Sequence, residues 1–221
     1  MMINPKFTAA FFDLDGTLVD TGPPHRQAEL QTLNAYGIPE IAPDHPITFG
    51  KGVIPGVQLV AEHYGIEDQE ALLAEYVKQW HLVTANGIEM LPGAKDAVTS
   101  AVVYGASVGL VTSGDSNYAN AFIEKSGLAE SFSTVVTLDD VTNMKPHPEP
   151  YLTAAENLDV QPAHCLVFED SETGFRSARA AGMTSVGVGA VAIELSESEE
   201  RGPDMAIQSF VGFDIWGVRP R

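Results

Sequence analysis

Short apolar segments alternate with helical segments through the second half of this chain, and this alternation is the feature that most limits its possible folds. Apolar runs that stop at turn residues predict strands at 106–112, 134–137, 165–169 and 185–188. Helical periodicity, prolines and glycine caps predict helices at 92–105, 117–126, 148–158 and 173–181. Strands in alternation with helices favour a parallel, doubly wound sheet of the Rossmann-like α/β class.

One more apolar run, Thr8–Phe12, predicts a strand of the same sheet, although a long helical region follows it. That region shows no strand pattern, and helices are expected at 25–36, 53–64 and 68–85. Before them, Thr21-Gly22-Pro23-Pro24 is expected to break the chain as a hinge. We therefore predict an α/β core from residues 1–20 and 88–221, with an all-helical cap domain, residues 21–87, inserted into it.

Acidic residues far outnumber basic ones, with 30 Asp and Glu against 12 Lys and Arg and a formal net charge of −18. This charge repels nucleic acid and anionic membranes, so neither is an expected partner. A small anionic substrate is compatible with it, because a few lysines and helix N-termini can reverse the local field. The single cysteine, Cys165, is expected in the core, excludes an internal disulfide and suits a reducing cytosol. No apolar run approaches the ~18 residues of a membrane span. We expect a cytoplasmic protein that is a monomer or a weak homodimer.

Two carboxylates, Asp13 and Asp15, directly follow the first predicted strand. In open parallel sheets the ligand binds beyond the carboxyl ends of the strands, so both acids are expected where chemistry is usually done. The Asp-Gly pair that follows is also common in plain turns. A helix-loop-helix calcium site does not fit, because positions 6 and 12, counted from Asp13, are Leu18 and Pro24 rather than Gly and Glu.

Three later segments bring polar groups to predicted strand or loop ends. Thr112-Ser113-Gly114 supplies a hydroxyl and two amides that could bind an anion. Lys145 precedes a proline-initiated helix, although an exposed surface lysine is the common alternative. Glu169-Asp170 ends an apolar strand, where buried acids need a partner, and Mg²⁺ is the fitting one for oxygen ligands.

These segments, in this order, resemble the motifs of the haloacid dehalogenase superfamily, in its phosphoglycolate phosphatase and β-phosphoglucomutase-like branch with a helical cap. The matching motifs are Asp13-x-Asp15-Gly16-Thr17-Leu18, the strand ending in Thr112, Lys145-Pro146-x-Pro148 and Glu169-Asp170. The resemblance implies a Mg²⁺-dependent phosphoryl transfer enzyme with the α/β core and helical cap described above.

The resemblance also implies roles for individual residues. Asp13 would be the nucleophile that becomes an aspartyl phosphate, and Asp15 the general acid and base. The metal would be held by Asp13, by the main-chain carbonyl of Asp15 and by Asp170, with Glu169 as a ligand or behind one. Thr112 and the amides of Ser113 and Gly114 would hold the phosphoryl group. Lys145 would offset the negative charge and bind a phosphoryl oxygen.

The acceptor of the phosphoryl group separates a phosphatase, which uses water, from a mutase, which uses a sugar hydroxyl. In this superfamily an acid at Asp15 favours phosphomonoester chemistry. His25 and Lys51-Gly52 resemble cap residues of β-phosphoglucomutase, where His25 would assist Asp15 and Lys51 would reach the substrate. That mutase has an arginine for the distal phosphate four residues after the lysine, and this chain has Pro55. We therefore predict a phosphatase for a small phosphorylated metabolite, such as a sugar phosphate or a phosphoglycolate-like monoester.

Other interpretations stay open at this point. His25 can equally be an ordinary residue of a first helical turn, and Lys51 a solvated lysine. Tyr76 and Trp80 are expected in the core of the cap rather than on a substrate platform. For the whole chain, the alternatives are a β-phosphoglucomutase-type mutase and a catalytically inactive regulator that binds a phosphorylated ligand or Mg²⁺.

Overall fold

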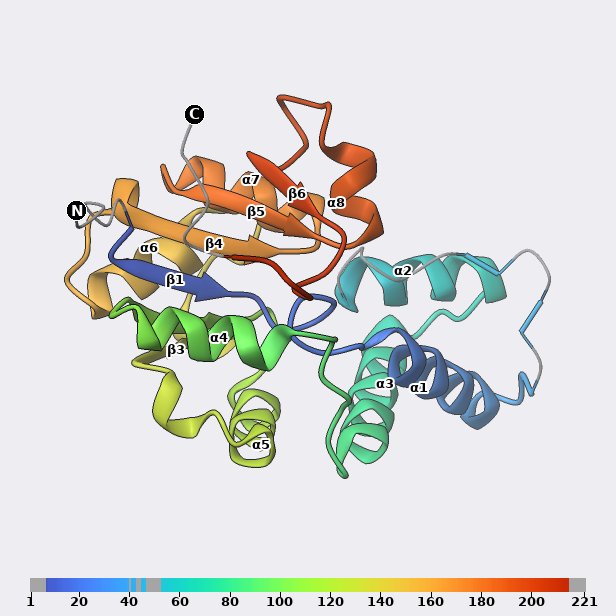
Figure 1. Ribbon diagram of the computed structural model, residues 1–221. Coiled ribbons are helices and arrows are strands. Elements are labelled where there is room, and N and C mark those ends of the chain that lie inside the picture. The colour runs from blue at the N-terminus through green and yellow to red at the C-terminus, as the bar shows by residue number, and fades with distance from the viewer. Residues whose placement is uncertain (1–6, 40, 43–44, 47–52, 215–221) are drawn as a thin grey trace, which may run out of the picture. The chain divides into compact units, whose positions relative to one another are not determined.

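The computed structural model describes residues 7–39, 41–42, 45–46 and 53–214 of the chain (Figure 1). Contacts divide the chain into two compact units. The α/β unit is formed by residues 1–20 and 89–221, and the helical unit by residues 21–88.

Six parallel strands form the sheet of the α/β unit, in the order β3-β2-β1-β4-β5-β6 (Figure 1). They are β1 Ala9–Phe12, β2 Ser107–Val111, β3 Thr134–Val136, β4 Cys165–Glu169, β5 Thr184–Val188 and β6 Met205–Ile207. At the centre, Phe12 of β1 pairs with Leu110 of β2 and with Phe168 of β4. The chain proceeds outward from β1 in both directions, so the strand order reverses there and creates the crevice where such sheets bind ligands. The predicted Rossmann-like α/β class is confirmed.

Helices cover both faces of this sheet because side chains of a strand alternate between its faces. They are α4 Ala94–Val103, α5 Ser116–Ser126, α6 Glu149–Asn157, α7 Glu172–Ala180 and α8 Ala190–Leu195, with short 3₁₀ turns η1 Ala129–Ser131, η2 Leu138–Asp140 and η3 Pro162–His164. In Figure 1, α4 lies in front of the sheet, and α6 and α7 lie behind it. Phe11 and Val167 are buried in one cluster with residues of α6 and α7. Phe12 and Phe168 face the other side, where their rings stack at a centroid distance of 4.6 Å.

Three helices make up the helical unit, namely α1 Gly22–Ala35, α2 Val53–Tyr64 and α3 Gln69–Thr84. Helix α3 packs against both α1 and α2. Tyr76 and Trp80 of α3 are buried, as the sequence indicated, and their rings lie against that of His25 on α1.

Two details of the sequence interpretation need correction. The chain break expected at 21–24 is wrong, because α1 already begins at Gly22 and its prolines occupy the first helical turn. Proline fits there since the amides of a first turn have no partner within the helix. A hinge at this boundary stays a prediction. Strand β6 was not expected, because it has only three residues, Met205–Ile207, and none of them is fully buried. Among the described residues, no helix combines the length and apolar character needed to cross a membrane.

The stacked pair Phe12–Phe168 is expected to contribute strongly to the stability of the α/β unit. Replacing the fully buried Phe168 by Ala removes this contact and leaves a cavity, and we expect the free energy of unfolding to fall by about 3–5 kcal/mol. Val103→Ala, at a side chain that is 77% exposed, is the control and should change it by less than about 0.5 kcal/mol. Urea denaturation followed by circular dichroism measures both. Equal small losses would mean that the aromatic layer is not a stabilising core.

Candidate functional site

Three neighbouring strands end in polar residues at one edge of the sheet. Asp13 follows β1, Thr112 follows β2, and Glu169 is the last residue of β4. Asp13 and Thr112 extend the ladder beyond their strands, because their N–H groups donate to the carbonyls of Phe168 and Val136, each at 2.9 Å. The backbone of this edge is therefore held by the sheet, and its side chains project from fixed positions.

Lys145 is buried in the middle of this edge, with its side chain only 4% exposed. Its ammonium group donates to Asp13 Oδ1 at 2.6 Å, to Glu169 Oε1 at 2.6 Å and to the carbonyl of Val111 at 2.9 Å. All three N–H donors are thus used. Burial by itself lowers the pKa of this lysine, but the charges of Asp13 and Glu169 outweigh that effect and raise it, so the side chain stays protonated.

Glu169 is fully surrounded by hydrogen-bond donors. Its Oε1 accepts from Lys145 and from the Tyr151 hydroxyl, the latter at 2.8 Å. Its Oε2 accepts from the N–H of Asp170 at 3.2 Å, and from the N–H and the hydroxyl of Ser171 at 3.4 and 3.1 Å. Such a carboxylate is locked in one orientation by its neighbours. Gly174 is needed beside it, since a Cβ there would lie 1.9 Å from the Glu169 carboxyl carbon.

The carboxylate of Asp170 differs from that of Glu169 in its hydrogen bonding. In the part of the chain that the structure describes, no donor is hydrogen-bonded to it. The backbone of Gly16, in the loop after β1, approaches this carboxylate so closely that a Cβ would lie 2.1 Å from Oδ2. Gly16 also has φ of 78°, which favours glycine, so the loop can make this approach.

Carboxylate oxygens of Asp13, Glu169 and Asp170 all lie within 4.8 Å of one another. With Asp15 there are four carboxyl groups at this edge, and one ammonium group, that of Lys145, which contacts Asp13 and Glu169 directly. An all-oxygen donor set with excess negative charge suits a hard divalent cation. The residues therefore fit a divalent metal ion, with Asp170 as the group that is still open to bind it.

Burial and mutual repulsion keep protons on part of this cluster. Burial, followed by the charge of Glu169, raises the pKa of Asp13 to about 8, against the lowering effect of Lys145. Burial and the charge of Asp13 likewise raise the pKa of Asp170 well above its ordinary value. A cation bound at the site would lower these pKa values again, because its positive charge favours the ionised carboxylates.

Asp15 is held by two hydroxyl groups. The hydroxyl of Tyr118 donates to Asp15 Oδ1 at 2.7 Å, and that of Thr112 donates to Oδ2 at 3.4 Å. Burial raises the pKa of Asp15 to about 6, although the bond from Tyr118 lowers it. A carboxyl group with this pKa can give and take a proton near neutral pH.

In the expected phosphate-binding segment, Thr112-Ser113-Gly114, the two amides are not both free to bind a phosphate. Thr112 is buried and Ser113 is exposed, while the N–H of Gly114 donates to the Thr112 hydroxyl at 3.0 Å. One of the two amides is therefore already bonded within the segment. The structure does bring Thr112 beside Asp15, as the strand pairing requires.

The predicted residues of the cap are placed only in part. Lys51 and Gly52 lie outside the described residues. His25 lies in α1, where its Nδ1 is hydrogen-bonded to the Tyr76 hydroxyl and its ring stacks on Trp80 at 4.3 Å between centroids. Burial lowers the pKa of His25 to about 4, so the ring is uncharged at neutral pH. A role for His25 beside Asp15 stays a prediction.

Three residues of the site were missed by sequence reasoning, namely Tyr118, Tyr151 and Ser171. Ser171 and Asp115, which precedes Tyr118 by three residues, have the sequence signature of helix N-caps, so their helices could have been expected to begin there. Tyr151 has no such signal, because its bond to Glu169 depends on the packing of α6 beneath the sheet.

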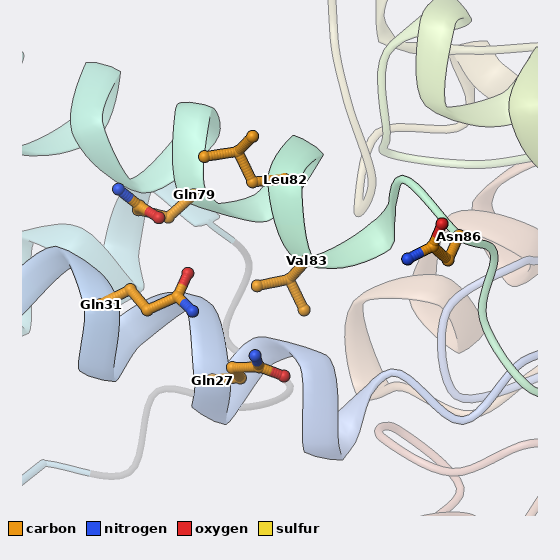
Figure 2. Close-up of a pocket in the computed structure, with 6 residues that line it drawn as sticks. All are labelled: Gln27, Gln31, Gln79, Leu82, Val83 and Asn86. Carbon is orange, nitrogen blue, oxygen red and sulfur yellow. The ribbon is translucent and has the colours of Figure 1, made fainter.

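Figure 2 shows a hollow in the helical unit, between α1 and α3. Its lining consists of amide and aliphatic side chains, from Gln27, Gln31, Gln79, Leu82, Val83 and Asn86. None of these groups is a nucleophile or an acid, so this hollow offers no catalytic side chain.

Fold and site together define an α/β enzyme with an acidic centre at the switch point of its sheet. A family model described as haloacid dehalogenase-like hydrolase matches residues 10–188. This range includes both acids of the first loop, the buried lysine and the acid pair at the end of β4. The chain belongs to the haloacid dehalogenase-like hydrolase family.

Named relatives place the chain among the phosphatases of this family, so it is a phosphomonoester hydrolase. It is 33% identical to a fructose-1-phosphate phosphatase of Escherichia coli over 185 residues, which are 83% of this chain and 97% of that protein. It is 32% identical to a phosphoglycolate phosphatase of Salmonella typhimurium over 226 residues, covering 90% of this chain and 88% of that protein.

Solved structures share the fold over almost the full length. A haloacid dehalogenase-family hydrolase of Entamoeba histolytica aligns with a TM-score of 0.79 and 26% identity, covering 95% of this chain and 96% of that chain. A candidate β-phosphoglucomutase of Thermotoga maritima aligns with a TM-score of 0.73 and 27% identity, covering 92% of this chain and 95% of that chain.

The raised pKa values predict a pH-dependent response of stability to a divalent cation. Between about pH 4 and about pH 8 the folded protein holds a proton on Asp13 that the unfolded chain has lost, so this group's stabilising contribution falls as the pH rises. Metal binding must displace such protons. Adding saturating MgCl₂ to EDTA-treated protein should raise the melting temperature by roughly 5–10 °C near pH 8, and by much less near pH 5.

Differential scanning fluorimetry measures the melting temperature, and the response to MgCl₂ is compared in a test variant and a control variant. Asp170→Asn should lose most of the response, while Asp96→Asn, which removes an exposed carboxylate in the first turn of α4, should keep it. A response of equal size at both pH values would contradict the proton displacement.

Proposed function

We propose that this protein is a Mg²⁺-dependent phosphatase that hydrolyses a small phosphorylated metabolite through an aspartyl phosphate on Asp13. A sugar phosphate or a phosphoglycolate-like monoester is the proposed substrate class. The observation that carries the proposal is the buried acidic cluster, with Lys145 in its centre, at the ends of β1, β2 and β4. The E. coli and Salmonella relatives, which are named for fructose 1-phosphate and phosphoglycolate, support the substrate class.

Asp13, Asp170 and the main-chain carbonyl of Asp15 are the proposed metal ligands. Glu169 is proposed to act from behind them, because its two oxygens already accept from Lys145, Tyr151, Ser171 and the Asp170 amide. When bound, Mg²⁺ would neutralise the carboxylates and attract a phosphoryl oxygen.

The proposed reaction has two steps. In the first, an oxygen of Asp13 attacks phosphorus, the bond from phosphorus to the leaving oxygen breaks, and Asp15 gives its proton to that oxygen. In the second, Asp15 takes a proton from water, which attacks phosphorus and releases phosphate from Asp13. The bond from Lys145 to Oδ1 fixes the Asp13 carboxylate and leaves Oδ2 as the attacking atom. Thr112 and the amide of Ser113 are proposed to hold the phosphoryl group.

The helical unit is proposed to act as a cap that selects the substrate. His25 and, in the part of the chain outside the described residues, Lys51 and Gly52 are its proposed contacts. The half-buried and uncharged ring of His25 suits hydrogen bonding to a neutral hydroxyl better than pairing with an anion.

The nucleophile is tested directly by substitution. Wild-type protein should hydrolyse p-nitrophenyl phosphate in the presence of Mg²⁺, and EDTA should abolish this. Asp13→Asn should lower kcat by about a thousandfold or more, because an amide oxygen cannot form the covalent intermediate. Asp96→Asn is the control that should leave kcat unchanged. Full activity in Asp13→Asn would exclude the nucleophile, and wild-type protein that is inert toward many phosphates would favour a catalytically inactive regulator that binds a phosphorylated ligand.

A β-phosphoglucomutase-type activity is the second candidate, favoured by the similarity to the Thermotoga maritima structure. Such a mutase must hold a second phosphate with a cation. Pro55, the position considered for that contact, is an exposed and uncharged residue of the first turn of α2.

The two activities give different products from one substrate. Incubated with β-glucose 1-phosphate and a bisphosphate primer, the protein is expected to release glucose and inorganic phosphate, because nothing at Pro55 retains a bisphosphate for a second transfer. Product analysis by ¹³C and ³¹P NMR makes the distinction. Glucose 6-phosphate as the main product would reverse the choice in favour of the mutase.

A further inference from the structure

The shortest hydrogen bond to Asp15 comes from a residue outside the four motifs. Tyr118, in the first turn of α5, is buried and donates its hydroxyl to Asp15 Oδ1 at 2.7 Å. The other oxygen, Oδ2, is approached by the Thr112 hydroxyl at the longer distance of 3.4 Å. The two oxygens of this carboxyl group are therefore not equivalent.

Local structure fixes the position of Tyr118 in two ways. The side chain of Asp115 caps α5 and accepts from the N–H of Tyr118 at 2.8 Å, which sets the start of the helix and the direction of the tyrosine. The ring then lies against Gly114, where a Cβ would be only 2.6 Å from the Tyr118 Cδ1 atom. A side chain at position 114 would push the ring, and with it the hydroxyl, away from Asp15.

We propose that Tyr118 is a positioning residue for Asp15, holding it by Oδ1 so that Oδ2 is the oxygen that exchanges the proton. This inference rests on the phosphatase activity proposed above and adds a residue to it. A tyrosine hydroxyl can donate to the ionised carboxylate that is left after the proton has moved to the leaving oxygen. Its ring, held by the packing at Gly114, also limits rotation of the bonded carboxyl group.

The inference predicts which substrates depend on Tyr118. In the first step, Asp13 attacks phosphorus while the leaving oxygen takes the bonding electron pair and a proton from Asp15. An alkyl leaving group, as in a sugar phosphate, is a strong base and needs that proton. A 2,4-dinitrophenolate leaving group is a weak base and departs without it. Loss of the Tyr118 hydroxyl should therefore affect the two substrates unequally.

The test compares wild type with Tyr118→Phe in saturating Mg²⁺, using kcat/KM because it reports the steps up to and including cleavage of the phosphate ester. For an alkyl phosphate that wild-type protein hydrolyses, kcat/KM should fall by about 10- to 100-fold, and for 2,4-dinitrophenyl phosphate by less than about threefold. Tyr104→Phe, at a tyrosine that is 64% exposed, is the matched control and should change neither value.

A second variant keeps the hydroxyl but displaces it. Gly114 has no positive φ, so Gly114→Ala is compatible with the backbone while its Cβ meets the ring of Tyr118. It should show the same selective loss on the alkyl phosphate. Melting temperatures of all variants would separate this effect from unfolding.

The outcomes distinguish the inference from the proposed function. Equal losses on both substrates in folded Tyr118→Phe, or no loss on either, would overturn the role of Tyr118 while leaving the phosphatase assignment intact. Wild-type protein that hydrolyses neither substrate would overturn the proposed function and the inference that rests on it.

Discussion

The rest of the site depends on one buried cation, the ammonium group of Lys145. It bonds Asp13 and Glu169, each at 2.6 Å, and its third donor binds a main-chain carbonyl of β2. Three segments that are far apart in sequence are thereby connected through one atom. Removal of such a partner leaves buried charge uncompensated, which costs about 3–5 kcal/mol in proteins. Carboxylates can be gathered at this edge of the sheet because that charge is present.

The negative charge that Lys145 leaves uncompensated allows the cluster to bind a cation or to transfer a proton. One lysine cannot neutralise four carboxyl groups, and burial raises the pKa values of Asp13, Asp15 and Asp170. The cluster thus suits both a divalent cation and a group that moves a proton. The Glu169 carboxylate is instead held in one orientation by the hydrogen-bond donors of its neighbours. Neighbouring acids in one sequence motif therefore have distinct environments, and Gly16 and Gly174 provide the space that each needs.

Similarity over the whole chain does not single out a substrate. The relatives named for fructose 1-phosphate and for phosphoglycolate are 33% and 32% identical to this protein, although their substrates differ in size and shape. In the mechanism that we propose, the acidic edge acts only on the phosphate group, so it would not distinguish these substrates. We propose that substrate discrimination comes from the helical unit, where the ring of His25 lies against the buried rings of Tyr76 and Trp80.

The sequence by itself determined the fold class and the acids at the strand ends, because periodicity and turn residues report on local structure. It was wrong where a local signal had two meanings, as at the prolines of α1, and it missed β6, which is too short to show a pattern. Only the tertiary structure decided the partners of each side chain. The bonds of Tyr118 to Asp15 and of Tyr151 to Glu169 join distant segments, and their formation depends on strand order and helix packing rather than on any neighbouring residue.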